Sequence, residues 1–194
     1  MKDIANFLFE VGMLKKTPRS GFQFLGSGGE SVAEHVLRAI FIGYTLCKLE
    51  KGVDEYRVVK ICLVHDLPEA RTGDMNYVNK KYVSVDEQKA VRELTETLFF
   101  GDDIKSAIDE FNEKKTRESL LAHDADQLAL ILQLKEYGDL GNKYSEEWIQ
   151  YAVKRLHTDT ARKVARSIVE TDSSHWWFKD KSDWWVNGNS GNDH

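Results

Sequence analysis

Helical spacing of apolar residues runs through nearly the whole chain, and this feature limits the possible folds more than any other. Apolar side chains recur three and four positions apart, whereas the strict alternation of a half-buried strand is nearly absent. Only two prolines, Pro18 and Pro68, interrupt the pattern. In a chain of 194 residues, of which 41% are hydrophobic, such helices can bury a sizeable core. The sequence therefore predicts an all-α fold, a single bundle of about eight helices.

Polar residues mark where several of these helices begin. Ser31-x-x-Glu34 has the pattern of a capping box, and Ser84-x-x-Glu87 repeats it. Asp54 is the expected cap of the helix between them. The helices are expected near residues 4–14, 31–49, 54–66, 84–100, 102–111, 116–137, 145–156 and 158–170.

Composition argues against several other classes of protein. No apolar run approaches the ~20 residues that span a bilayer, and the first ten residues lack the cleavage site of a signal peptide. The net charge is -5 and no basic block stands out, which argues against double-stranded nucleic acid as a partner. Cys47 and Cys62 lie in helical patterns and are expected to be buried thiols. We expect a cytoplasmic protein that binds neither nucleic acid nor membrane.

The helical pattern fades near residue 170, and residues 171–194 form a tryptophan-rich extension with four of the five tryptophans. Such rings rarely stay in water, so we expect the extension to dock on its own domain or on a dimer partner. A role in covering a ligand pocket is the alternative. The last eight residues are expected to be disordered.

The stretch C-L-V-H-D-L-P-E-A-R-T-G-D sets His65 and Asp66 side by side at the end of an apolar helix. Pro68 forbids an undisturbed helix through this point, because proline lacks an N–H and clashes with the preceding turn. A third residue with metal-ligand chemistry, His35, lies one turn into another helix, in S-V-A-E-H-V. Each of these residues alone also fits a structural role, but the order H…HD…D on separate helices is a much more specific signal.

The final aspartate of that order lies in H-D-A-D-Q-L, where Asp124 and Asp126 compete. A charged aspartate on the apolar side of a helix is costly unless it is paired or bound to a metal. The two lie about 200° apart on the helical wheel, so only one of them can face the metal, and geometry permits either. Two imidazoles with two carboxylates suit Mn²⁺, Co²⁺, Fe²⁺, Zn²⁺ or Ni²⁺, with Mg²⁺ a poorer candidate.

Together these motifs resemble the HD-domain metal-dependent phosphohydrolases, in particular the branch of the 5′-deoxynucleotidases and the HD-domain-containing-protein-2-type proteins. The resemblance covers residues 1–170 and rests on V-A-E-H-V, L-V-H-D-L-P-E-A-x-x-G-D and A-D-Q-L. It implies an all-helical HD domain over that range, a homodimer, and one divalent metal ion. Asp126 is preferred to Asp124 because the alanine before it and the leucine two positions after it match the family's helix. The ligands that the resemblance implies are His35, His65, Asp66 and Asp126.

Glu69 follows Asp66 by three residues and is a reasonable general acid or base, or an orienter of the attacking water. Its ordinary alternative is a surface carboxylate paired with Arg71. With the metal, such a group could serve the hydrolysis of a phosphate monoester, which requires a held phosphate, an activated water and neutralised transition-state charge.

The resemblance also implies a substrate site. Arg19 would bind the 5′-phosphate, because its guanidinium forks onto phosphate oxygens, and Asp74 would meet the sugar hydroxyls. Phe22 follows Arg19 by three positions, as an aromatic residue does in the eukaryotic-like branch. Ser20 stands where bacterial members place a tryptophan directly after the arginine, so this chain departs from their pattern.

The leading hypothesis is therefore a metal-dependent phosphohydrolase that removes the 5′-phosphate from (deoxy)nucleoside monophosphates. One alternative is an HD-type phosphodiesterase or nucleoside triphosphohydrolase, although larger substrates generally need more basic residues than this chain shows around the site. The other is a non-catalytic dimer that binds metal and nucleotide.

Overall fold

A computed structural model describes residues 1–178 and residue 188, and helices dominate this part of the chain. The described residues contain no strand, and their nearest approach to one is an isolated bridge between Pro18 and Ser31. The predicted all-α class is confirmed. The longer helices are α1 (Lys2–Val11), α2 (Val32–Leu49), α3 (Glu55–Val64), α5 (Glu87–Thr95), α6 (Gly101–Glu113), α7 (Arg117–Asp139), α8 (Ser145–Val153) and α9 (Asp159–Glu170). The shorter ones are η1 (Gly12–Lys15), η2 (Ser20–Leu25), α4 (Glu69–Thr72), η3 (Asn79–Lys81) and α10 (His175–Phe178).

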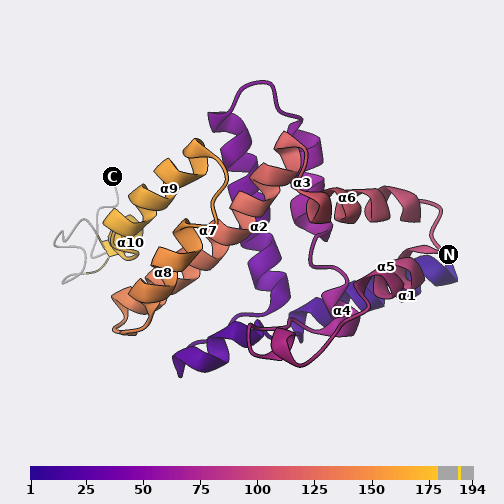
Figure 1. Cartoon of the computed structure of the whole chain (residues 1–194), viewed down its shortest axis with the longest axis horizontal. Coiled ribbons are helices and arrows are strands. Elements are labelled where there is room, and N and C mark those ends of the chain that lie inside the picture. The colour runs from indigo at the N-terminus through magenta and orange to yellow at the C-terminus, as the bar shows by residue number, and fades with distance from the viewer. Residues whose placement is uncertain (179–187, 189–194) are drawn as a thin grey trace.

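Helices α2, α3 and α7 form the centre of the molecule (Figure 1). Helices α1, α4 and α5 lie at the end that carries the N-terminus, and α8, α9 and α10 lie at the opposite end. No helix in the described part of the chain is long and apolar enough to cross a membrane.

The expected caps are found at two of the three positions. Ser31 and Glu34 form a complete capping box, and the Asp54 carboxylate accepts a hydrogen bond from the backbone N–H of Arg57. The third expectation was wrong, because Asp86 rather than Ser84 caps α5.

Helix α5 also ends earlier than expected, at Thr95 rather than near Phe100. The chain turns back on itself after Thr95. A Cβ at Gly101 would lie 2.0 Å from the carbonyl oxygen of Thr95, so the turn brings these backbones together in a way that only glycine permits.

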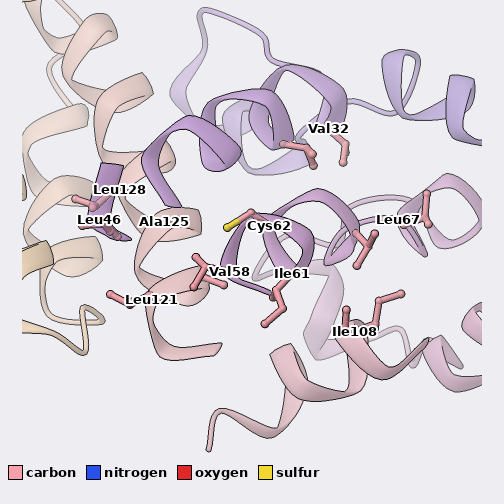
Figure 2. Close-up of a cluster of buried hydrophobic side chains, with 14 of the residues drawn as sticks. Val32, Leu46, Val58, Ile61, Cys62, Leu67, Ile108, Leu121, Ala125 and Leu128 are labelled. Atoms are coloured by element: carbon pink, nitrogen blue, oxygen red, sulfur yellow. The ribbon is translucent and has the colours of Figure 1, made fainter. Parts of the chain in front are cut away.

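Close contact between the three central helices depends on Gly43 of α2. A Cβ at this position would lie 2.8 Å from the sulfur of Cys62 on α3 and 3.8 Å from the Cβ of Ala125 on α7. Figure 2 shows Cys62 and Ala125 in the same buried cluster as Leu46 of α2. Both cysteines are buried free thiols, as predicted. This close packing of α2, α3 and α7 also fixes the positions of His65 and Asp126, because Cys62 and Ala125 lie close to them in sequence.

Candidate metal centre

The proline at position 68 produces the predicted break in the helix. Helix α3 ends at Val64, and Pro68 is the N-cap of the short helix α4. His65 and Asp66 therefore lie in the tight turn between two helices, where their side chains can face α2 and α7. His65 is 6% exposed, so this turn lies inside the molecule rather than on its surface.

The structure brings all four expected ligands together. Nε2 of His35 lies 2.9 Å from Oδ1 of Asp126 and 3.6 Å from Oδ2 of Asp66. Nε2 of His65 lies 3.3 Å from the same Asp66 oxygen. His35, His65 and Asp126 each offer one nitrogen or oxygen that could bind a metal, and these three atoms all lie within 4.8 Å of one another. Three distant helical segments thus converge at one point.

The bonding of the two imidazoles fits a metal site. Nδ1 of His65 lies 2.8 Å from the carbonyl oxygen of Cys62, which fixes the proton on Nδ1 and leaves Nε2 with a free lone pair. Nε2 of each histidine is buried and makes no hydrogen bond of good geometry within the described part of the chain. Buried polar atoms without partners are costly, and a divalent cation would satisfy both nitrogens.

The charge on Asp126 also suits a cation. Burial raises the pKa of its carboxyl, but His35, His65 and Arg19 lower it by more, so the net shift is downward. Asp126 is therefore ionised at neutral pH and available as an oxygen ligand.

Asp124 has a different role. It is fully buried and accepts hydrogen bonds from the backbone N–H of His157, at 2.6 Å, and from the N–H and hydroxyl of Thr158. Thr158 is itself the N-cap of α9. Asp124 thus joins α7 to the start of α9 and is not part of the cluster of His35, His65 and Asp126.

A cavity of about 580 Å³ opens beside this cluster. His65, Asp66 and Asp126 line it, and so do the four other residues expected at the site, namely Arg19, Phe22, Glu69 and Asp74. Phe22 is 5% exposed and packs edge-on against Tyr137, with 5.5 Å between ring centroids, so most of its surface serves the core.

The pKa values of Arg19 and Glu69, which also line this cavity, are shifted by their surroundings. Nη1 of Arg19 lies 3.4 Å from Oδ2 of Asp66. Burial lowers the pKa of Arg19, but the carboxylates of Asp66, Asp126 and Asp74 raise it by more. Burial and the nearby Asp66 and Asp74 raise the pKa of Glu69 to about 9. Arg71 contacts Glu10 and Glu93, each at 3.0 Å, so it is not the partner of Glu69.

Ser20 holds Asp74 in position by two hydrogen bonds. In the sequence, Ser20 was noted only as a departure from the pattern of the bacterial family members. Its backbone N–H donates to Oδ2 of Asp74 at 2.8 Å, and its hydroxyl donates to the Asp74 carbonyl at 2.7 Å. Sequence reasoning also missed Tyr77, Trp148 and Arg155, which line the cavity. The Arg155 guanidinium lies 5.7 Å from the centre of the Tyr77 ring. Their sequence positions carry no motif, so only the fold reveals them.

Comparison with known proteins agrees with this geometry. The family model of the HD domain matches residues 11–168, and the chain belongs to this family. A 5′-deoxynucleotidase HDDC2 from Dictyostelium discoideum is 34% identical over 149 residues, which are 71% of this chain and 78% of the relative. A protein of the same name from Danio rerio is 27% identical, with 90% of each chain covered.

Solved structures share the fold. A conserved hypothetical protein from Pyrococcus furiosus superposes with a TM-score of 0.73 at 26% identity, covering 86% of this chain and 99% of the other. A predicted metal-dependent phosphohydrolase from Magnetospirillum magnetotacticum has a TM-score of 0.69 at 21% identity, covering 87% of this chain and 90% of the other. The second similarity shows the fold alone.

Proposed function

We propose that this protein is a divalent-metal-dependent phosphohydrolase that removes the 5′-phosphate from deoxynucleoside monophosphates. The observation that carries the proposal is the convergence of His35, His65 and Asp126 beside a cavity that also contains Arg19 and Glu69. Membership of the HD-domain family and the names of the curated relatives support it. Asp66 completes a set of two nitrogen and two oxygen ligands, which suits Mn²⁺ or Co²⁺, with Fe²⁺, Zn²⁺ or Ni²⁺ also compatible.

A divalent ion in this site would act as a Lewis acid toward a phosphoryl oxygen and the attacking water. Arg19 remains charged among its carboxylate neighbours and provides a fork for the phosphate oxygens. Glu69 faces the same cavity, and its raised pKa keeps a proton on the carboxyl at neutral pH in the metal-free protein. It can give this proton to the departing 5′-oxygen or, once ionised, accept one from the water.

The cavity is large enough for a nucleotide rather than for phosphate alone. The backbone N–H of Ser20 donates to Oδ2 of Asp74, so Oδ1 can accept a hydrogen bond from a sugar hydroxyl. Arg155, Tyr77 and Trp148 also line the cavity, where they can contact the base.

Phosphate release from nucleoside monophosphates, cyclic nucleotides and deoxynucleoside triphosphates tests the proposal, with Mn²⁺, Co²⁺, Mg²⁺ or EDTA. Release from monophosphates alone, abolished by EDTA, is the expected result. Preference for cyclic or triphosphate substrates would favour the phosphodiesterase or triphosphohydrolase alternative. Binding without release under every metal would favour the non-catalytic one.

Two variants separate chemistry from phosphate binding. Glu69→Ala should keep the metal but slow turnover by about 10²–10⁴-fold, the usual range for a lost acid or base. Arg19→Ala should weaken substrate binding more than metal binding. Unchanged kcat in the first variant, or unchanged kcat and KM in the second, would remove that residue from the mechanism.

We also propose that the protein is a homodimer, as its family resemblance implies. Leu37 and Phe41 of α2 are 58% and 65% exposed, which is a large apolar area for a surface helix. Light scattering coupled to gel filtration would give the mass, and a monomer at working concentration would contradict this proposal. The cytoplasmic location and the absence of a nucleic-acid partner stay predictions.

A further inference from the structure

Gln127 is a polar residue of the cavity wall to which the proposed mechanism assigns no role. It directly follows the expected ligand Asp126 on α7 and lines the cavity. Its side-chain Nε2 donates a hydrogen bond to Oδ2 of Asp126 at 2.8 Å. The amide of Gln127 therefore contacts a carboxylate that is expected to bind the metal.

The two ends of this amide have different surroundings. An ionised carboxylate can only accept hydrogen bonds, so the end of the amide that faces Asp126 must be the NH₂ group. The other end, Oε1, is buried and has no hydrogen-bond partner in the described part of the chain. A buried oxygen without a partner is costly, so the contact with Asp126 sets the orientation of the amide.

The two oxygens of Asp126 also differ. Oδ1 lies 2.9 Å from Nε2 of His35, another expected ligand. Oδ2 is the oxygen to which Gln127 donates. The carboxylate is thus held at one oxygen and directs the other toward the expected metal site.

We propose that Gln127 is a positioning residue that holds Oδ2 of Asp126, so that Oδ1 alone is presented to the metal. The hydrogen bond would limit rotation of the carboxylate, and partners that orient a ligand in this way tune metal affinity. Asp126 would take one position on the cation rather than two, which leaves room for water and a phosphoryl oxygen. The inference rests on the proposed metal site and goes beyond it by naming the group that orients one ligand.

The neutral charge of glutamine suits this role. Lysine or arginine could also donate to Asp126, but a positive charge so close to the site would oppose a divalent cation. An amide supplies the donor without that repulsion, although Oε1 is left unpaired.

The first test observes the hydrogen bond in Zn²⁺-loaded protein, because a diamagnetic ion permits nuclear magnetic resonance. The side-chain amide of Gln127 should give ¹H–¹⁵N signals that are protected from exchange with water and that disappear in Gln127→Met. Gln133, partly exposed on the same helix and outside the cavity lining, provides the reference amide. Equal exchange of the two amides would overturn the inference.

Affinity for Zn²⁺, measured by competition with a chromophoric chelator, is the second test. Gln127→Met keeps the length of the side chain but removes the donor, so it should bind Zn²⁺ about 10–100-fold more weakly. Gln133→Met is the matched control, because it makes the same chemical change on the same helix. It should bind Zn²⁺ within about threefold of wild type.

Stability of the metal-free protein separates positioning from a merely structural role. The side chain of Asp126 is 18% exposed, so water can replace the lost hydrogen bond when no metal is bound. Both variants should therefore unfold at the same denaturant concentration as wild type.

Three results would refute the inference while wild type still binds Zn²⁺. They are unaltered Zn²⁺ affinity in Gln127→Met, an equal loss of affinity in Gln133→Met, and weaker binding that is matched by an equal loss of metal-free stability. If wild type itself bound no Zn²⁺, the proposed function would fail as well.

Discussion

At the scale of single residues, the two aspartates of H-D-A-D-Q-L show what sequence reasoning can and cannot decide. The helical wheel shows only that one of them can face the metal. The structure gives Asp126 two imidazole neighbours and gives Asp124 three donors at the start of α9. That second environment was not predictable, because it depends on a helix that begins more than thirty residues later. The family resemblance, not the spacing, selected the residue that lies at the cluster.

This difference predicts opposite phenotypes for two neighbouring substitutions. Asp124→Ala leaves buried donors of His157 and Thr158 without an acceptor, so it should lower the free energy of unfolding by about 1–3 kcal/mol while the metal is retained. Asp126→Ala should lose the metal instead. Chemical denaturation and elemental analysis measure the two effects. Full metal content in Asp126→Ala would contradict the ligand assignment.

Glu69 gives a prediction about pH in the EDTA-treated protein. A carboxyl whose pKa is raised by folding stabilises the folded state in its protonated form. Its contribution is complete below the ordinary value of 4.5 and is lost as the pH rises toward about 9. Wild type should therefore lose stability between about pH 5 and 8, and Glu69→Gln should lose less.

Denaturant unfolding at several pH values measures this slope. Substitution of the exposed Glu147 by glutamine provides the control and should leave the slope as in wild type. Parallel profiles for wild type and Glu69→Gln would mean that burial of Glu69 does not perturb its ionisation.

At the scale of helices, start signals that act within one turn were predictable, and contacts between helices were not. The capping box at Ser31 and the break at Pro68 follow from local chemistry, and both were predicted correctly. The prediction that Ser84 caps α5 was wrong because the carboxylate of Asp86, two residues further on, accepts a hydrogen bond from the backbone N–H of Lys89. Competition between two nearby caps depends on where the following helix packs. Gly43 illustrates the same limit, because in sequence it is only an unfavourable helix residue.

Gly43→Ala should destabilise the protein. Its Cβ would lie 2.8 Å from the Cys62 sulfur and 3.3 Å from Val58, in a core without room to adjust. Overpacking typically costs 1–3 kcal/mol, and the better helix propensity of alanine offsets about 1 kcal/mol. We expect a net loss of about 1 kcal/mol.

Two variants check the cause of this loss. Gly12→Ala is the control, because a Cβ there meets nothing within 4 Å. Adding Cys62→Ala to Gly43→Ala should recover stability relative to the sum of the single variants, since it removes the clashing sulfur. Strict additivity in this double-mutant cycle would show that the sulfur is not the obstacle.

At the scale of the whole molecule, the sequence predicted one helical domain over residues 1–170 and a separate extension over 171–194. The HD-domain match covers 11–168, which leaves the exact boundary a prediction. Of the extension, the structure describes the first eight residues and Gly188. Trp176 lines a hollow formed by α7 and α9, away from the metal cavity. The expected docking and the expected disorder of the last eight residues otherwise lie outside the described residues.

The metal cluster joins three segments that lie far apart in the sequence and that the rest of the fold holds by packed side chains and a few ion pairs, such as Arg38 with Glu136. His35 comes from α2, His65 and Asp66 from the turn after α3, and Asp126 from α7, the helices at the centre of Figure 1. A ligand that binds only the folded state stabilises it by RT ln(1 + [L]/Kd), about 2.7 kcal/mol at 100 times Kd. Bound metal should therefore raise the free energy of unfolding of the whole domain.

We expect Mn²⁺ at 100 times its Kd to raise the melting temperature of EDTA-treated protein by about 5–10 °C, as that energy implies for a chain of this size. Scanning calorimetry over a series of Mn²⁺ concentrations measures the shift. His35→Gln should abolish most of the shift whatever its own melting temperature, because the comparison is between each protein with and without metal. An equal response of the two proteins would place the Mn²⁺ somewhere other than the junction of α2, α3 and α7, and the hydrolase proposal would lose its structural basis.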